Sequence, residues 1–136
     1  MTRGDSYAVR LDAAKAAAAA GPLEFIEHGS VHAVEPLSFG DVVLARKDMP
    51  ASYHLAVVVD DAFQEVTLVT RGADLLPAAH VKRLLQALLG YSAPAYAHHR
   101  LILDKDGRKF SKRDRSVTIR GLRAAGVTPA GIEALF

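Results

Sequence analysis

The segment from Val66 to Leu103 constrains the fold more than any other part of the chain. It contains a strand-like run over Val66–Thr70, an amphipathic helix that Gly90 closes, and a second apolar stretch over Tyr96–Leu103. A strand, a helix and a strand in this order form a crossover in which the two strands lie parallel in one sheet. We therefore predict an α/β fold with parallel strands.

Shorter elements flank this segment. They are a helix over Arg10–Ala20, strands over Leu23–Ile26 and Val42–Arg46, and two short helices over Gly121–Ala125 and Pro129–Leu135. The first helix should end at Gly21-Pro22, because glycine and proline past a helix end are stop signals. Residues 27–39 show no clear period, and we predict irregular chain there.

The segment after Pro50 admits two interpretations. Its β-branched run over Ala56–Val59 favours a strand. Ser52, however, can cap a helix, and the apolar residues that follow it lie at helical spacings. The local pattern leaves strand and helix open.

Composition excludes several classes of protein. Half of the 136 residues are hydrophobic and 24% are charged, which supports a real core and argues against disorder. No apolar run approaches the roughly 18 residues of a membrane-spanning helix, so we predict no membrane partner. The chain contains no cysteine, which excludes disulfides and is compatible with a reducing cytoplasm. We predict one cytoplasmic domain, or a piece of a larger one.

Positive charge is concentrated near the end of the chain. Eight lysines and arginines but only two aspartates occur from Lys105 to Arg123, although the net charge is only +2. Within this stretch, Lys109 and Lys112 are spaced in a KFSKR loop that follows an apolar run. Two compact ammonium groups on such a loop suit a polyphosphate. The local field indicates a phosphate-bearing ligand or nucleic acid, with a solvated basic face as the alternative.

Two histidines, His28 and His32, have a spacing that would align metal ligands only on a helix. Gly29 lies between them. We therefore interpret both as structural or surface histidines rather than as a metal site.

Several motifs stand in a fixed order along residues 40–114. They are GDVVLARKD (Gly40–Asp48), SYHLAVVVDD (Ser52–Asp61), VTLVTRGADLL (Val66–Leu76), LLQALLG (Leu84–Gly90) and LDKDGRKFSKRD (Leu103–Asp114). Together they resemble the C-terminal half of the catalytic domain of glutamyl-type class I aminoacyl-tRNA synthetases, and KFSKR resembles the KMSKS loop of that class. The resemblance implies the second half of a Rossmann-type nucleotide-binding fold with parallel strands and a small helical C-terminal segment.

The resemblance also implies a division of the chain. Residues 1–39 correspond to a connecting segment, residues 40–118 to the second half of the Rossmann-type domain with the KMSKS-like loop, and residues 119–136 to a short helical tail. Within the family, the chain is most similar to the short paralogues that attach glutamate to the queuosine base of tRNA(Asp). It ends soon after the KFSKR loop, without an anticodon-binding domain, and it has alanine at Ala73, where full-length members usually have glutamate.

The family's roles carry over to matching positions. Tyr53 and Arg71 resemble the residues that bind the substrate L-glutamate. Lys112 resembles the second lysine of KMSKS, which contacts ATP, and Lys109 is its partner; both would neutralise the departing pyrophosphate together with Mg²⁺. The resemblance thus implies L-glutamate, ATP and tRNA(Asp) as substrates. Some family members also hold zinc, for which this chain offers no ligands.

The chain departs from the family in two respects. The HIGH motif is absent, so we expect a missing N-terminal half as a partner and little or no activity from this chain alone. The helix after Asp74 reads Ala79-His80-Val81-Lys82 where Thr-Pro-Arg-Gln is common. No role is assigned to His54, Asp74, His98 or His99.

Two alternative functions stay open. The first is a fragment of a glutamyl-tRNA synthetase that charges the tRNA 3′ end. The second is a non-catalytic remnant that binds nucleotide or RNA through its basic end.

Overall fold

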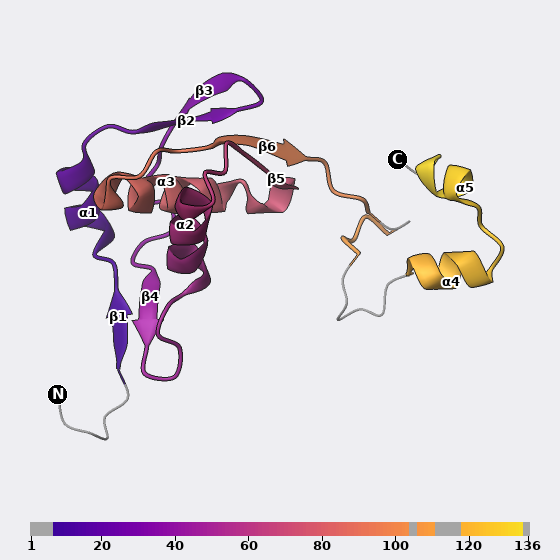
Figure 1. The fold of residues 1–136 in the computed structure, drawn as a ribbon, viewed down its shortest axis with the longest axis horizontal. Helices are drawn as coiled ribbons and strands as arrows, with labels where there is room; N and C mark the ends of the chain where they lie inside the picture. Colours follow the sequence, from indigo (N-terminus) through magenta and orange to yellow (C-terminus); the bar gives the residue numbers. More distant parts are fainter. Residues whose placement is uncertain (1–6, 104–105, 111–117, 135–136) are drawn as a thin grey trace. The chain divides into compact units, whose positions relative to one another are not determined.

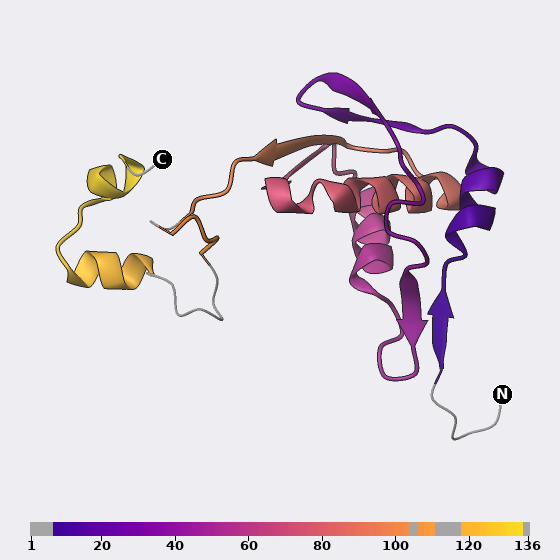
Figure 2. The ribbon, with the colours of Figure 1, turned by 180° about the vertical axis from the view of Figure 1, so that it is seen from behind.

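The structure is a computed structural model that describes residues 7–103, 106–110 and 118–134. The chain divides into two compact units, Met1–His99 and Arg100–Phe136, drawn from opposite sides in Figures 1 and 2. The first unit contains β1 (Ala8–Arg10), α1 (Ala13–Ala20), β2 (Glu24–Glu27), β3 (Ser30–Ala33), β4 (Val43–Arg46), α2 (Tyr53–Phe63), β5 (Leu68–Gly72), the 3₁₀ helix η1 (Ala73–Leu75), α3 (Pro77–Leu89) and β6 (Ala95–His99). The second contains α4 (Ile119–Ala124) and α5 (Pro129–Glu133).

The first unit contains a four-stranded sheet in the order β3-β2-β6-β5. Strand β6 runs parallel to both of its neighbours, β2 and β5, whereas β3 is antiparallel to β2. Helix α3 connects β5 to β6 and lies along one face of the sheet (Figure 1). This crossover confirms the predicted α/β fold with parallel strands, and it brings the carboxyl ends of β5 and β6 to the same edge.

Helix α3 packs through two different faces. Ala79 joins Phe25 and Tyr96 in a cluster against the sheet. Val81 and Leu85 join a second cluster with α2. Full burial of a leucine side chain contributes about 1.5–3 kcal/mol, so these contacts fix α3 between the sheet and α2.

The ambiguous segment after Pro50 is helical and forms α2. Ser52 caps it, because the Ser52 side-chain oxygen accepts a hydrogen bond from the backbone N–H of Leu55 at 3.3 Å. Val58 is 1% exposed and packs against α3. Capping and burial therefore outweigh the strand preference of the β-branched run.

The first helix begins later than predicted. Helix α1 starts at Ala13, because Asp12 caps it by accepting a hydrogen bond from the backbone N–H of Lys15 at 3.0 Å. Residues 8–10 instead form β1, which pairs with β4 in an antiparallel ribbon. Gly21 and Gly90 follow α1 and α3 with φ of 69° and 72°, which confirms both predicted helix ends.

The hairpin of β2 and β3 corrects the prediction of irregular chain over residues 27–39. His28 and Gly29 form its turn with φ of 48° and 80°, and Glu27 pairs with Ser30. Positive φ at both turn positions matches the twist of a two-residue hairpin. Every residue of β3 is exposed, so this strand lacks the alternation that reveals a half-buried strand.

The second unit contains a bridge between Leu103 and Lys109 and the two helices α4 and α5. Thr118 and Thr128 cap these helices, and each side-chain oxygen accepts a backbone hydrogen bond, at 3.0 and 3.1 Å. The two short helices predicted for this part of the chain are thus confirmed. Across the described ranges of both units, no helix is long and apolar enough to cross a membrane.

Candidate functional site

The carboxyl ends of β5 and β6 carry the polar side chains of the candidate site. Arg71 lies near the end of β5, in register with His98 of β6. Tyr53, the first residue of α2, meets Arg71: the Arg71 guanidinium donates a hydrogen bond to Tyr53 Oη, and its central carbon lies 5.6 Å from the centroid of the tyrosine ring. Ligands of open parallel sheets bind outside the carboxyl ends of the strands. The structure thus brings together the two residues that the sequence assigned to one substrate.

The chemistry of this pair leaves both residues able to bind a ligand. A guanidinium only donates hydrogen bonds, so Tyr53 Oη accepts from Arg71 and keeps its own proton for an acceptor on a ligand. Arg71 retains further N–H groups, which suit a carboxylate or a phosphate. Tyr53 is 58% exposed and Arg71 is half-buried, so the pair is accessible.

A third side chain, Lys82 of α3, also reaches the tyrosine ring. Its Nζ lies 5.4 Å from the centroid of the Tyr53 ring, and the residue is only 1% exposed. In the sequence, Lys82 stands out only as a departure from the family pattern. The signal for Lys82 in the sequence was its position on the apolar side of an amphipathic helix. Gln86, four residues later on the same helix, is also buried.

His54 and Asp61 show the electrostatic effect of Arg71. Burial lowers the pKa of His54, and the positive charge of Arg71 lowers it further. Burial raises the pKa of Asp61, against the opposing effect of Arg71 and with a smaller raising effect of Asp60. His54 Nδ1 is buried and has no hydrogen-bond partner among the described residues. The surroundings of His54 therefore favour its neutral imidazole.

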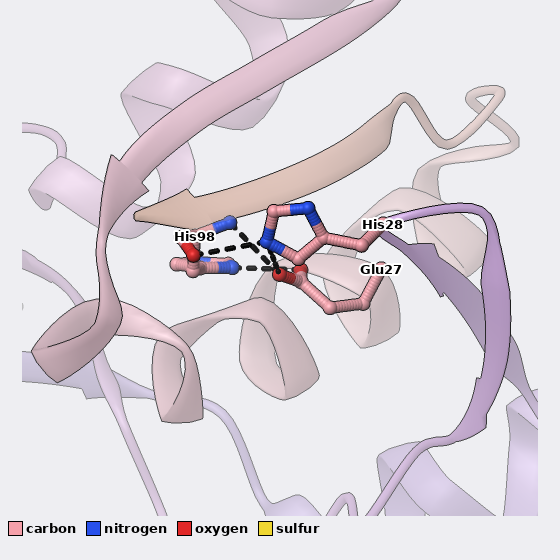
Figure 3. A network of polar contacts seen from close by, with 3 residues as sticks. All are labelled: Glu27, His28 and His98. Atoms are coloured by element: carbon pink, nitrogen blue, oxygen red, sulfur yellow. Dashed lines mark hydrogen bonds and ion pairs between the residues drawn. The ribbon is translucent and has the colours of Figure 1, made fainter. Parts of the chain in front are cut away.

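A buried carboxylate holds the end of β6 (Figure 3). Glu27 accepts two hydrogen bonds from His98, from its backbone N–H at 2.8 Å and from its Nδ1 at 2.7 Å. His28 Nε2 lies 3.0 Å from the His98 carbonyl oxygen and 3.3 Å from Glu27 Oε1. Burial raises the pKa of Glu27, but the hydrogen bonds and charges of His98 and His28 outweigh burial and lower it overall.

This network ties the turn of the β2–β3 hairpin to the carboxyl edge of the sheet. Because an ionised carboxylate only accepts hydrogen bonds, His98 Nδ1 carries the proton. The His98 ring stacks on Tyr96 with centroids 5.9 Å apart, and its Nε2 is buried without a partner among the described residues. His98 is in register with Arg71, so the network fixes the backbone beside the candidate site. No sequence motif pointed to Glu27.

The candidate site described above lies within the first unit. Lys109 belongs to the second unit, where it forms a bridge with Leu103. Lys112 lies outside the described residues. Their predicted contact with ATP stays a prediction.

The described residues form no group of three or more histidine, aspartate or glutamate side chains that could hold a metal ion. His28 lies in the hairpin turn, and His32 lies in β3 and stacks on Phe25 with ring centroids 5.7 Å apart.

The fold, with polar side chains at the carboxyl ends of β5 and β6, is typical of a nucleotide-binding α/β catalytic domain. Comparison with known proteins gives its family. The family described as tRNA synthetases class I (E and Q), catalytic domain, matches residues 3–135. The chain belongs to this family of class I aminoacyl-tRNA synthetases, which confirms the resemblance drawn from its motifs.

The chain is similar to curated relatives of two names. Glutamyl-Q tRNA(Asp) synthetase of Rhodobacter capsulatus is 47% identical over 113 residues, which cover 80% of this chain and 41% of that protein. The protein of the same name from Nocardia farcinica is 50% identical over 96 residues, which cover 71% of this chain and 31% of that protein. Glutamate–tRNA ligase 2 of Syntrophus aciditrophicus is 41% identical over 93 residues, 68% of this chain and 19% of that protein.

Solved structures agree with the fold. The glutamate–tRNA synthetase of Elizabethkingia anophelis superposes with a TM-score of 0.55 at 37% identity, and the match covers 69% of this chain and 19% of that one. The chain therefore spans less than half the length of the relatives that it matches.

Proposed function

We propose that this chain forms the part of a glutamate-activating ligase that holds L-glutamate, and that the complete enzyme transfers glutamate to the queuosine base of tRNA(Asp). The observation that carries the proposal is the hydrogen-bonded Tyr53–Arg71 pair at the carboxyl edge of the sheet. The names of the most similar relatives support the choice of acceptor.

In the first step, a carboxylate oxygen of glutamate attacks the α-phosphorus of ATP. A new O–P bond forms, the bond to the β-phosphate oxygen breaks, and pyrophosphate leaves with the electron pair. Arg71 would hold the carboxylate through paired N–H groups, and the Tyr53 hydroxyl would orient it. One such charge-assisted contact supplies roughly 2–4 kcal/mol of transition-state stabilisation.

The basic loop would act on the leaving group. Lys109 and Lys112 would neutralise the charge that develops on pyrophosphate, with ATP bound as its Mg²⁺ complex. In the second step, a hydroxyl oxygen of queuosine forms an ester bond with the acyl carbon of glutamyl-adenylate. The bond from that carbon to the phosphate oxygen breaks, AMP leaves with the electron pair, and the hydroxyl proton passes to water. We assign residues 40–118 to this chemistry, residues 1–39 to a connecting segment and residues 119–136 to a helical tail.

The unpaired edge of the sheet supports the proposal that this chain needs a second polypeptide, the N-terminal half of the enzyme. Strand β5 stands last in the order of the described sheet, so one of its edges is unpaired there. Leu68 of β5 is 53% exposed. An exposed edge of this kind accepts a further strand. A segment with the HIGH motif would pair there and complete the ATP site.

The group that accepts glutamate, queuosine or the tRNA 3′ end, distinguishes the proposal from the alternative of a glutamyl-tRNA synthetase fragment. A glutamyl-tRNA synthetase fragment is favoured by the similarity to glutamate–tRNA ligase 2 and to the solved synthetases. The test supplies the chain with a separately expressed N-terminal half of the Rhodobacter capsulatus relative and offers labelled glutamate to tRNA(Asp) with and without queuosine. We expect label only on queuosine-containing tRNA, including tRNA that lacks its 3′-terminal adenosine. Label that requires the 3′ adenosine would establish the alternative.

A non-catalytic RNA-binding remnant predicts a different result. It would bind tRNA in a salt-dependent manner and would transfer no glutamate to any of these acceptors.

A further inference from the structure

Lys82 lies on α3 between residues that pack against the sheet and residues that pack against α2. Ala79, one turn earlier, belongs to the cluster with Phe25 and Tyr96. Gln86, one turn later, donates from Nε2 to Tyr96 Oη at 3.4 Å. Residues three and four apart lie on one side of a helix. Lys82 is therefore flanked by Ala79 and Gln86 on the side of the sheet and by Leu85 on the side of α2, and it is 1% exposed.

The contacts of Lys82 leave its charge poorly compensated. Its Nζ lies over the ring of Tyr53, and no carboxylate among the described residues lies within ion-pairing distance of this Nζ. A ring face attracts a cation, but a buried ammonium normally requires an anion as well. Arg71 adds a second cation at the same ring.

We propose that Lys82 is a second anion-binding residue of the Tyr53–Arg71 site and that it holds one carboxylate of the substrate while Arg71 holds the other. This inference rests on the proposed function, since it takes L-glutamate as the ligand. A dicarboxylate supplies two separated negative charges. The ring of Tyr53 contacts two cations, Arg71 from β5 and Lys82 from α3. The neutral form favoured at His54 adds no third positive charge there.

The same chemistry could be satisfied by a phosphate of ATP, and the test separates these two sources. Isotope-labelled wild-type chain is titrated with L-glutamate, L-glutamine or ATP. Nuclear magnetic resonance follows the Lys82 side-chain signal, assigned by its loss in Lys82→Met, and the Tyr53 ring signals. We expect L-glutamate to shift both sets of signals, and L-glutamine to bind more weakly because it lacks one charge. Lys82→Met should lower the affinity for L-glutamate by about 10- to 100-fold.

Two variants control for charge and for folding. Lys15→Met removes an exposed lysine that pairs with Asp12 on α1, and its affinity for L-glutamate should equal that of the wild type. Lys82→Met should melt no lower than the wild type, because an apolar side chain of similar volume replaces a buried charge. If Lys82 only packs against the ring of Tyr53, Lys82→Met would instead lower the melting temperature without changing the preference of the chain for glutamate over glutamine.

The possible results are distinguishable. L-glutamate that shifts Tyr53 and binds Lys82→Met with wild-type affinity would overturn the role of Lys82 and leave the proposed function intact. A Lys82 signal that moves with ATP but not with L-glutamate would assign the residue to phosphate and overturn the carboxylate assignment. No response of any signal to L-glutamate would refute the proposed glutamate site and this inference together.

Discussion

Replacement of Glu27 by glutamine should destabilise the first unit, because Glu27 holds two donors of one residue. Its carboxylate accepts from the backbone N–H and from Nδ1 of His98 at 2.8 and 2.7 Å, and its side chain is 8% exposed. Glutamine has the same shape as glutamate, but only one of its two terminal atoms is an oxygen that accepts hydrogen bonds. Its NH₂ group would therefore face one of the two donors of His98.

The size of the effect follows from these contacts. Loss of a buried hydrogen bond to a charged group costs about 1.5–3 kcal/mol. A domain of this size loses roughly 3–4 °C per kcal/mol, so Glu27→Gln should melt roughly 5–12 °C below the wild type at neutral pH. Circular dichroism during thermal and urea unfolding measures it. Glu24→Gln is the matched control, since Glu24 lies on the same strand with an exposed side chain.

The pH dependence gives a second test. The pKa of Glu27 is lowered in the folded chain from its ordinary value of 4.5. A carboxyl with a lowered folded pKa contributes stability above its unfolded pKa and loses it as the pH falls through the folded pKa. The difference between wild type and Glu27→Gln should therefore be complete at neutral pH and shrink below pH 4.5. Equal midpoints for Glu27→Gln and Glu24→Gln at neutral pH, or a difference that persists unchanged in acid, would refute the reasoning.

Three further substitutions test the helix ends and the site. Ser52→Ala removes the cap of α2 and should cost about 1 kcal/mol in urea unfolding, with Ser52→Asp restoring most of it; an unchanged midpoint would contradict the capping role. Gly90→Ala should cost about 1 kcal/mol because of the positive φ alone, since a Cβ there meets no atom within 4 Å; equal stability would show that this φ relaxes freely. Arg71→Lys keeps the charge but loses the paired N–H groups, and calorimetry should show about tenfold weaker L-glutamate binding; wild-type affinity would remove Arg71 from the site.

Elements with a regular buried face were predictable from the sequence. Helix α3 alternates apolar and polar residues at helical spacing, and Gly90 marks its end, so both its type and its boundary were confirmed. Strands β5 and β6 were predicted because each is an apolar run beside that helix. Strand β3 was missed because it is exposed along its whole length and therefore leaves no pattern.

Parts of the site depended on information that the local sequence does not hold. The meeting of Tyr53 with Arg71 was predicted through the family motifs, not through spacing. Glu27 and His98 lie 71 residues apart, and no local signal links them. Lys82 could not be distinguished from a lysine whose ammonium reaches solvent past an apolar helix face; only the fold shows it against Tyr53.

The most direct test of the central claim is glutamate-dependent exchange of labelled pyrophosphate into ATP without tRNA. It uses this chain together with the separately expressed N-terminal half of the Rhodobacter capsulatus relative. We expect exchange that needs both polypeptides and falls about 10²- to 10³-fold in Arg71→Met and in Lys112→Ala. Exchange that the N-terminal half supports alone, or that both substitutions leave unchanged, would contradict a glutamate-activating role for this chain.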